Sequence, residues 1–259
     1  MYAKPRTTTL RWRFSAWALL AVMAVGAMRS SQAVAQCTTC PCNICIANEK
    51  EILITGSVTA DCIQVETTGK LRIEGAGKLT LIGPGMSKVD GKVLMTSDPE
   101  HHPELAFAAN DHEVTGNGKI TGFDDSVQIT IASGVKLTSG VKITGNLQIS
   151  GAGDFTNEGC VTTGPDAGKI DILVTGTIDD EVGACWEVKW VDTVLRFREE
   201  PACLKGDFKI TSGELRAGVD QDPLGDDIDV ITTGNLQQTG GKIIAGVNDS
   251  FKFGAAICP

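Results

Sequence analysis

Hydrophobic and polar residues alternate in short runs along most of the chain after residue 50. Leucine, isoleucine or valine recurs at alternate positions in runs such as KLRIE (70–74), KLTL (78–81) and KITGNLQIS (142–150), where glycine takes one of these positions in the last run. A period of two places side chains alternately on two faces, so each run predicts a short strand with one buried face. Beyond the first 36 residues, no segment repeats apolar positions with a helical period for more than two turns. The pattern therefore predicts an all-β fold.

The strand-like runs follow one repeated phrase, in which Thr or Ser, Gly and a polar residue precede the alternating apolar positions. Corresponding positions recur at intervals such as the 23 residues from Leu147 to Ile170 and the 21 from Gly213 to Gly234. An interval of this size suits one coil of a solenoid, which buries its apolar face by stacking on the next coil. Residues 50–259 are therefore predicted to form a parallel β-helix of roughly ten short coils. A β-sandwich, which also consists of many short strands, is the alternative.

The glycine-punctuated repeat resembles the right-handed parallel β-helix proteins in the broad sense. That group includes pectate-lyase-like enzymes and the passenger regions of bacterial adhesins. The resemblance covers most of residues 50–258 and rests on a generic repeat, so it implies a fold and no particular activity.

Residues 1–35 have the three parts of an export signal. Basic residues precede the apolar stretch Phe14–Met28, and Ala33–Ala35 (AVA) forms a small-x-small cleavage site. The apolar stretch is shorter than the roughly 20 residues that a membrane-spanning helix needs. We therefore expect a secreted, periplasmic or cell-surface protein without a membrane span once the signal is removed.

Segment 36–49, which follows the signal, is rich in cysteine. In an exported chain, closely spaced cysteines favour disulfide bonds, so we expect a disulfide-linked cap at the N-terminal end of the solenoid. The same spacing is compatible with zinc or an iron–sulfur cluster, which is the alternative. The cap cysteines are Cys37, Cys40, Cys42 and Cys45.

Two further cysteines, Cys185 and Cys203, bracket a segment predicted to form a hairpin or an unusually wide coil. We expect these two to pair with each other. The chain has nine cysteines in all. One of them must therefore stay free, pair with another chain or be modified.

The protein is acidic. Its formal net charge is −9, and it becomes −14 when the signal is removed, because five basic residues and no acidic residue leave. An acidic surface excludes nucleic acid as a partner, since phosphate recognition needs a basic surface. It also argues against an anionic polysaccharide as ligand unless cations bridge the contact.

One segment, residues 96–114, contains every histidine of the chain and several carboxylates. His101, His102, His112 and Asp111 are residue types that bind zinc or copper. They form the candidate metal site. A solvated acidic loop is the alternative.

A second candidate cation site lies near the C-terminus, where aspartates alternate with other residues. The spacing is similar to that of a calcium loop but lacks the EF-hand pattern, because Leu224 and Ile231 stand where ligands belong. Ca²⁺ is therefore the candidate cofactor, and the fold is expected to require none. The candidate ligands are Asp220, Asp222, Asp226, Asp227 and Asp229.

Trp186 and Trp190 are the only tryptophans that remain after removal of the signal. Flat aromatic rings beside polar groups can stack on sugars, so these two residues are candidates for ligand stacking. The alternative is that the indole rings fill the core.

The sequence contains no specific catalytic motif. Three aspartate pairs, at 124–125, 179–180 and 226–227, follow strand-like runs, and glycosidases need carboxylates held at a set separation. We expect a secreted, non-enzymatic β-solenoid that acts as a structural, surface-associated or adhesive module. Its expected partners are cell-surface or matrix polysaccharide or other copies of itself. The alternatives are a polysaccharide lyase or hydrolase and a self-assembling solenoid polymer.

Overall fold

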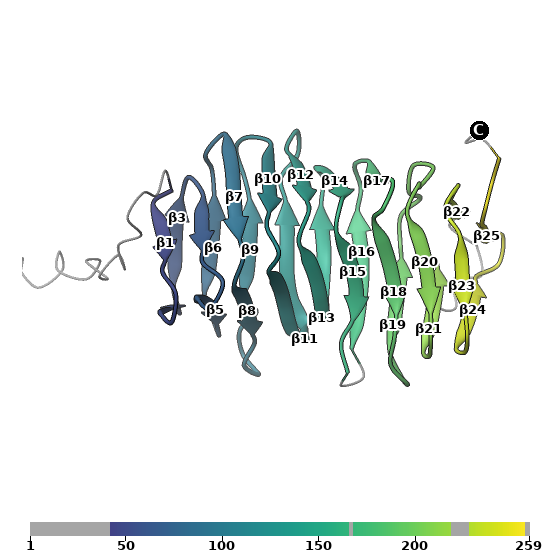
Figure 1. Cartoon of the computed structure of the whole chain (residues 1–259), viewed down its shortest axis with the longest axis horizontal. Helices are drawn as coiled ribbons and strands as arrows, with labels where there is room; N and C mark the ends of the chain where they lie inside the picture. The colour runs from purple at the N-terminus through teal and green to yellow at the C-terminus, as the bar shows by residue number, and fades with distance from the viewer. Residues whose placement is uncertain (1–41, 166–167, 219–227, 257–259) are drawn as a thin grey trace, which may run out of the picture. The chain divides into compact units, whose positions relative to one another are not determined.

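A computed structural model describes residues 42–165, 168–218 and 228–256 of the chain. Within these ranges the chain forms 25 strands and no helix. Every strand pair is parallel, and successive strands of each sheet belong to successive coils (Figure 1). The predicted parallel β-helix is therefore confirmed, with about nine coils instead of roughly ten, since the longest row contains nine strands.

Each full coil contributes one strand to each of three rows. The strands of the first row are present in the first seven coils. In the two coils that follow, Leu204 and Thr232 form an isolated parallel bridge in place of a strand pair. The first row consists of β1 (Ile44–Ile46), β4 (Ile63–Val65), β7 (Gly85–Val89), β10 (His112–Thr115), β12 (Lys136–Ser139), β14 (Asp154–Asn157) and β17 (Ile178–Asp180).

Two long strands bend to serve the second and third rows together. These are β11 (Lys119–Ile131) and β13 (Lys142–Gly151). The rest of the second row is β2 (Glu51–Ile54), β5 (Lys70–Glu74), β8 (Lys92–Thr96), β15 (Cys160–Thr163), β18 (Cys185–Val188), β20 (Asp207–Ile210) and β23 (Leu236–Gln238).

The third row completes each coil before the chain returns to the first row. Its other strands are β3 (Ser57–Ala60), β6 (Lys78–Leu81), β9 (Glu104–Phe107), β16 (Lys169–Val174), β19 (Val194–Phe197), β21 (Glu214–Ala217) and β24 (Lys242–Ala245). A separate pair, β22 (Asp229–Ile231) and β25 (Ser250–Lys252), lies at the C-terminal end of the described chain.

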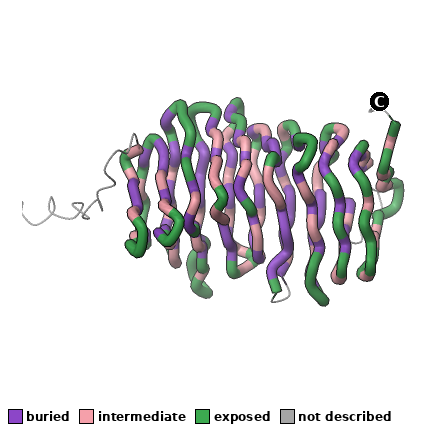
Figure 2. The backbone as a smooth tube through the Cα atoms, viewed as in Figure 1, coloured by how far each residue is buried: buried purple, intermediate pink, exposed green. Residues whose placement is uncertain are grey.

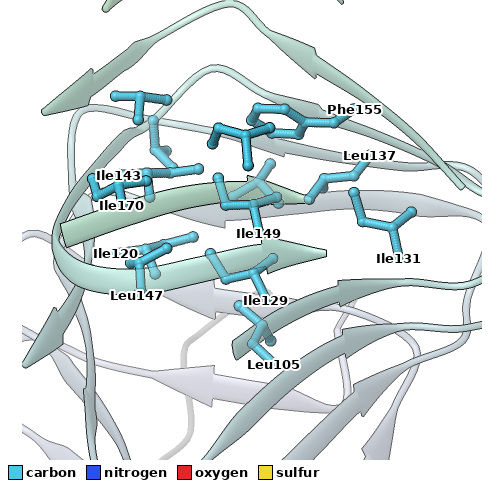
Figure 3. Packing of buried hydrophobic residues seen from close by; sticks show 14 of the residues in the cluster. Leu105, Ile120, Ile129, Ile131, Leu137, Ile143, Leu147, Ile149, Phe155 and Ile170 are labelled. Carbon is cyan, nitrogen blue, oxygen red and sulfur yellow. The ribbon is translucent and has the colours of Figure 1, made fainter. Parts of the chain in front are cut away.

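The core consists of apolar side chains stacked in register between the rows. Leu105, Ile129 and Ile149 occupy equivalent positions on three successive coils, and Figure 3 shows them beside apolar residues of the neighbouring rows. Buried and more exposed residues alternate along the coils (Figure 2). The period of two read from the sequence therefore separates an apolar interior from a polar wall.

Polar side chains at the corners link each coil to the next. An Asp or Asn oxygen of one coil accepts a hydrogen bond from a backbone N–H of the following coil. Because such an N–H would otherwise lack a partner, these bonds fix where each turn lies on its neighbour. The bonds run from Asn117 to Asp90 (3.1 Å), from Lys136 to Asp111 (2.8 Å), from Lys169 to Asn146 (3.0 Å), from Thr177 to Asp154 (2.7 Å) and from Asn235 to Asp207 (2.8 Å).

Disulfides also join neighbouring coils. Cys42 bonds to Cys62, and Cys160 bonds to Cys185, its register partner on the next strand of the second row. Cys45 and Cys203 are disulfide-bonded too. Cys37 and Cys40 of the predicted cap lie outside the described residues.

The predicted pairing of Cys185 with Cys203 is therefore wrong, and so is the hairpin between them. Strand β18 pairs with β15 and β20, whereas β19 pairs with β16 and β21. The chain continues around its coil instead of turning back. The cysteine nearest to Cys185 is consequently the one stacked on it, 25 residues earlier.

Candidate functional site

Four lysines lie in register on consecutive strands of the second row. Lys70, Lys92, Lys119 and Lys142, here called the lysine row, begin β5, β8, β11 and β13. The residues that follow them point into the core, so the lysines themselves lie on the outer wall. Neighbouring strands are about 4.8 Å apart, so the row presents four ammonium-bearing side chains at a regular interval.

The lysine row has few acidic neighbours. Lys70 Nζ lies 3.9 Å from Glu51 Oε2 at one end of the row. Within the described residues, Lys92, Lys119 and Lys142 have no carboxylate within ion-pairing distance. Three adjacent positive charges therefore face solvent on a protein whose net charge is negative.

A column of mostly hydroxyl side chains runs beside the lysine row. Leu94, Thr121, Thr144 and Thr162 are register partners on β8, β11, β13 and β15. Thr121 is only 8% exposed, and its Oγ1 has no hydrogen-bond partner within the described residues. A buried hydroxyl without a partner is uncommon, because it loses its hydrogen bonds to water.

A hollow of about 410 Å³ opens over these two columns, and its lining includes three of the four lysines together with Thr121 and Phe123. Its floor contains glycines at the bends of β11 and β13. Gly145 has a φ of 109° and lies over the carbonyl group of Gly122, so a side chain has no room there. The phenyl ring of Phe123 is 57% exposed. The hollow therefore combines ammonium groups, hydroxyl groups and one exposed aromatic ring.

A bulge in β11 begins directly after Phe123. Four residues, 124–127, separate Phe123 from Gln128, whereas a single residue separates their partners Asn146 and Gln148 on β13. A bulge of this kind bends a strand and changes the direction of its side chains.

The bulge also carries the pair Asp124 and Asp125. Asp124 Oδ1 accepts hydrogen bonds from Ser126 N (3.1 Å) and Ser126 Oγ (2.9 Å). The backbone hydrogen bond is the main cause that lowers the pKa of Asp124. The pKa of Asp125 is raised, first by its side-chain hydrogen bond with Asp124 and then by partial burial, although Lys169 acts in the opposite direction. The two carboxyl groups thus have pKa values shifted in opposite directions.

The structure does not bring the three histidines together. His101 Nδ1 lies 2.8 Å from Asp98 Oδ1 in the exposed loop between β8 and β9, where His102 is also exposed. Asp111 accepts the bond from Lys136 N at a corner. Across the described ranges, no three or more His, Cys, Asp or Glu side chains are grouped as a metal site. The geometry therefore gives the predicted site at His101, His102, His112 and Asp111 no support.

His112 belongs to the interior of the first row. Its Nε2 lies 2.7 Å from Ser87 Oγ, and its Nδ1 lies 3.4 Å from the carbonyl oxygen of Gly83. Ser87 Oγ also accepts a hydrogen bond from Ile63 N, so the serine hydroxyl donates to Nε2 and the ring N–H at Nδ1 donates to Gly83. Burial lowers the pKa of His112, which favours this neutral form.

The two tryptophans have different environments. Trp186 is fully buried, its Nε1 donates to Asp180 Oδ2 (2.6 Å), and its ring lies 5.0 Å from that of Phe197. Burial raises the pKa of Asp180. The prediction of ligand stacking is therefore wrong for Trp186, which fills the core. Trp190 is 42% exposed, with Lys189 Nζ 5.6 Å from its ring centre, and remains a candidate.

The candidate calcium loop falls largely outside the described residues. Among its five aspartates only Asp229 is described, on β22, where it accepts hydrogen bonds from Ser250 and from Lys252 Nζ (3.5 Å). Asp220, Asp222, Asp226 and Asp227 lie outside the described ranges. Calcium binding there stays a prediction.

None of the described residues forms a helix long and apolar enough to cross a membrane. Comparison with protein-family models, curated proteins and solved structures found no match.

Proposed function

We propose that the protein is an exported, non-catalytic β-solenoid that binds polysaccharide at a cell surface or in a matrix. The observation that supports this proposal is the hollow over β8, β11 and β13. There, the exposed ring of Phe123 lines the same hollow as Thr121, Thr144 and the glycines of the floor. Sugars present apolar ring faces and many hydroxyl groups, which aromatic rings and polar side chains recognise together.

The proposed binding wall is built on rigid elements. The strands that carry Thr121 and Thr144 are paired on both sides within the second row. Binding groups on strands keep their positions better than groups on loops, so little order has to be gained on binding. A regular wall of this kind suits an extended polymer.

Export of the protein rests on the sequence of residues 1–35 and agrees with the chemistry of the cysteines. Each of the six cysteines in the described ranges is disulfide-bonded. Disulfides persist in oxidising compartments, which include the periplasm and the extracellular space. The proposed place of action is therefore outside the cytoplasm.

The test uses residues 36–259 with their disulfides intact. The protein is applied to an array of polysaccharides with and without Ca²⁺, and both retention and newly formed chain ends are measured. We expect retention without new chain ends, and weaker retention for Phe123→Ala. Val182→Ala is the matched control, because Val182 is an exposed apolar residue away from the hollow. New chain ends in proportion to protein would contradict a non-catalytic role.

One observation favours a second candidate function, a polysaccharide-cleaving enzyme. Asp124 and Asp125 lie next to Phe123 and have pKa values shifted in opposite directions. Such a difference can separate the roles of general acid and general base. If chain ends appear and the protein is such an enzyme, Asp124→Asn and Asp125→Asn should each abolish them. Asp192→Asn, in the turn between β18 and β19, should leave them unchanged.

A further inference from the structure

We propose that the lysine row binds a linear acidic polysaccharide whose carboxylate or sulfate groups face the wall. The polymer runs along the solenoid axis, across β5, β8, β11 and β13. This inference rests on the proposed function and adds the charge and direction of the ligand.

The stacking of the lysines is the first ground for this assignment. Register places like charges on directly neighbouring strands, from Lys70 to Lys142. Like charges in such positions destabilise a sheet. A polymer with anionic groups at intervals along its length can neutralise every ammonium group of the row and so remove this repulsion. A single small anion can neutralise only part of the row.

Among the described residues, three members of this row lack the acidic partners that several other lysines have. Lys78 Nζ lies 2.6 Å from Glu104, Lys88 Nζ lies 3.0 Å from Asp90, and Lys169 Nζ lies 3.0 Å from Asp171. On the described part of the chain, Lys92, Lys119 and Lys142 have no such carboxylate. Their ammonium groups are thus available to an external anion.

The unpartnered hydroxyl of Thr121 is an independent ground for a ligand. Thr121 follows Lys119 by two residues on the outward side of β11, and it lines the same hollow. A hydroxyl or carboxylate group of a bound sugar would supply the hydrogen bond that Oγ1 lacks. Phe123, two residues further along, offers its ring to the face of the sugar.

The negative net charge of the protein disfavours binding of an acidic polysaccharide anywhere except at the lysine row. Without residues 1–35 the net charge is −14, which repels polyanions from most of the surface, so an acidic polymer is attracted only where positive charges are concentrated. Composition alone argued against an anionic polysaccharide. The register of four lysines overturns that reasoning, because it places positive charge at one location.

The experiment compares four immobilised polymers: hyaluronan, which carries carboxylates, dextran sulfate, uncharged dextran and duplex DNA. Equilibrium binding of residues 36–259 is measured at low and at physiological ionic strength. We expect binding to at least one of the two acidic polysaccharides that weakens as salt is added. Hyaluronan and dextran sulfate distinguish carboxylate from sulfate recognition. We expect weaker binding to dextran and to DNA.

Substitutions then test the row itself. Lys92→Gln, Lys119→Gln and Lys142→Gln together are expected to weaken binding about tenfold at low salt, since three exposed charge contacts are lost. The corresponding triple arginine variant is expected to retain binding. Thr121→Val is expected to weaken binding without lowering the free energy of unfolding, because it removes a hydroxyl that has no partner.

The matched control, Lys50→Gln, Lys136→Gln and Lys242→Gln, changes the net charge equally at lysines outside the row. We expect it to bind as the unmodified protein does, and circular dichroism verifies that every variant is folded. Equal loss in the row and control variants would overturn the inference, because net charge would then explain binding. If dextran or DNA binds as strongly as the acidic polysaccharides, the lysine row does not select an acidic polysaccharide and the inference is overturned. The proposed function is then tested by the polysaccharide array alone. Retention of none of the polysaccharides here or on the array would refute the proposed function as well.

Discussion

The disulfide between Cys160 and Cys185 should stabilise the solenoid measurably. It closes a segment of 25 residues, which is one complete coil. For a loop of this length, the loss of chain entropy in the unfolded state corresponds to about 3.5 kcal/mol at 25 °C. We therefore expect Cys160→Ala with Cys185→Ala to lower the free energy of unfolding by about 3 kcal/mol in urea denaturation monitored by circular dichroism.

The disulfide between Cys42 and Cys62 provides the internal comparison. Its separation of 20 residues gives nearly the same entropy, but it lies in the first coils described, whereas Cys160 and Cys185 lie in the middle of the stack. In a solenoid each coil contacts only its neighbours, so an end coil can open alone. We therefore expect removal of the Cys42–Cys62 bond to lower the free energy of the main unfolding transition less than removal of the Cys160–Cys185 bond does. A change below about 1 kcal/mol for the central pair would refute the chain-entropy reasoning.

Three further predictions concern buried polar groups and one bend. Trp186→Phe removes the donor to Asp180, so the free energy of unfolding should fall by about 1–3 kcal/mol in urea denaturation; an unchanged value would contradict the importance of this bond. Burial lowers the pKa of His112 below its ordinary value of 6.5. The free energy of unfolding should therefore keep the full contribution of neutral His112 above pH 6.5 and lose it as the pH falls through the folded-state pKa. A pH series of thermal unfolding should show a weaker decrease for His112→Gln, and parallel curves would count against this origin. Gly145→Ala should lower stability by about 1–3 kcal/mol, because φ is 109° and the Gly122 carbonyl is close; Gly56→Ala, where a new methyl group meets no atom, is the control for thermal unfolding.

The fold was predictable from sequence because each strand carries its own signal. Alternating residues such as Leu71 and Ile73 identify the buried face without knowledge of the neighbouring coil. The partner of Cys185 was not predictable, because register depends on the length of each coil. The coil from Lys142 to Cys160 takes 18 residues, whereas the coil from Lys92 to Lys119 takes 27.

The lysine row had a sequence signal that was not recognised. Three of its members occur in the phrase Gly-Lys-apolar, at Lys70, Lys92 and Lys119. The same phrase at Lys78 and Lys169 belongs to the third row, where ion pairs satisfy the charge. Only the three-dimensional register separates the two groups. The bulge that follows Phe123 was likewise not predictable from the sequence, because it is defined by comparison with the next strand.

The parallel stacking of the strands separates two properties of the wall that in most binding sites change together. Backbone hydrogen bonds between coils set the distance between neighbouring side chains, whereas the residue at each outward position sets only the chemistry there. A single substitution can therefore change what one coil recognises without moving the groups above and below it. Inserting a whole coil that begins with lysine would lengthen the row by one strand spacing, so both ligand length and ligand charge can be altered coil by coil.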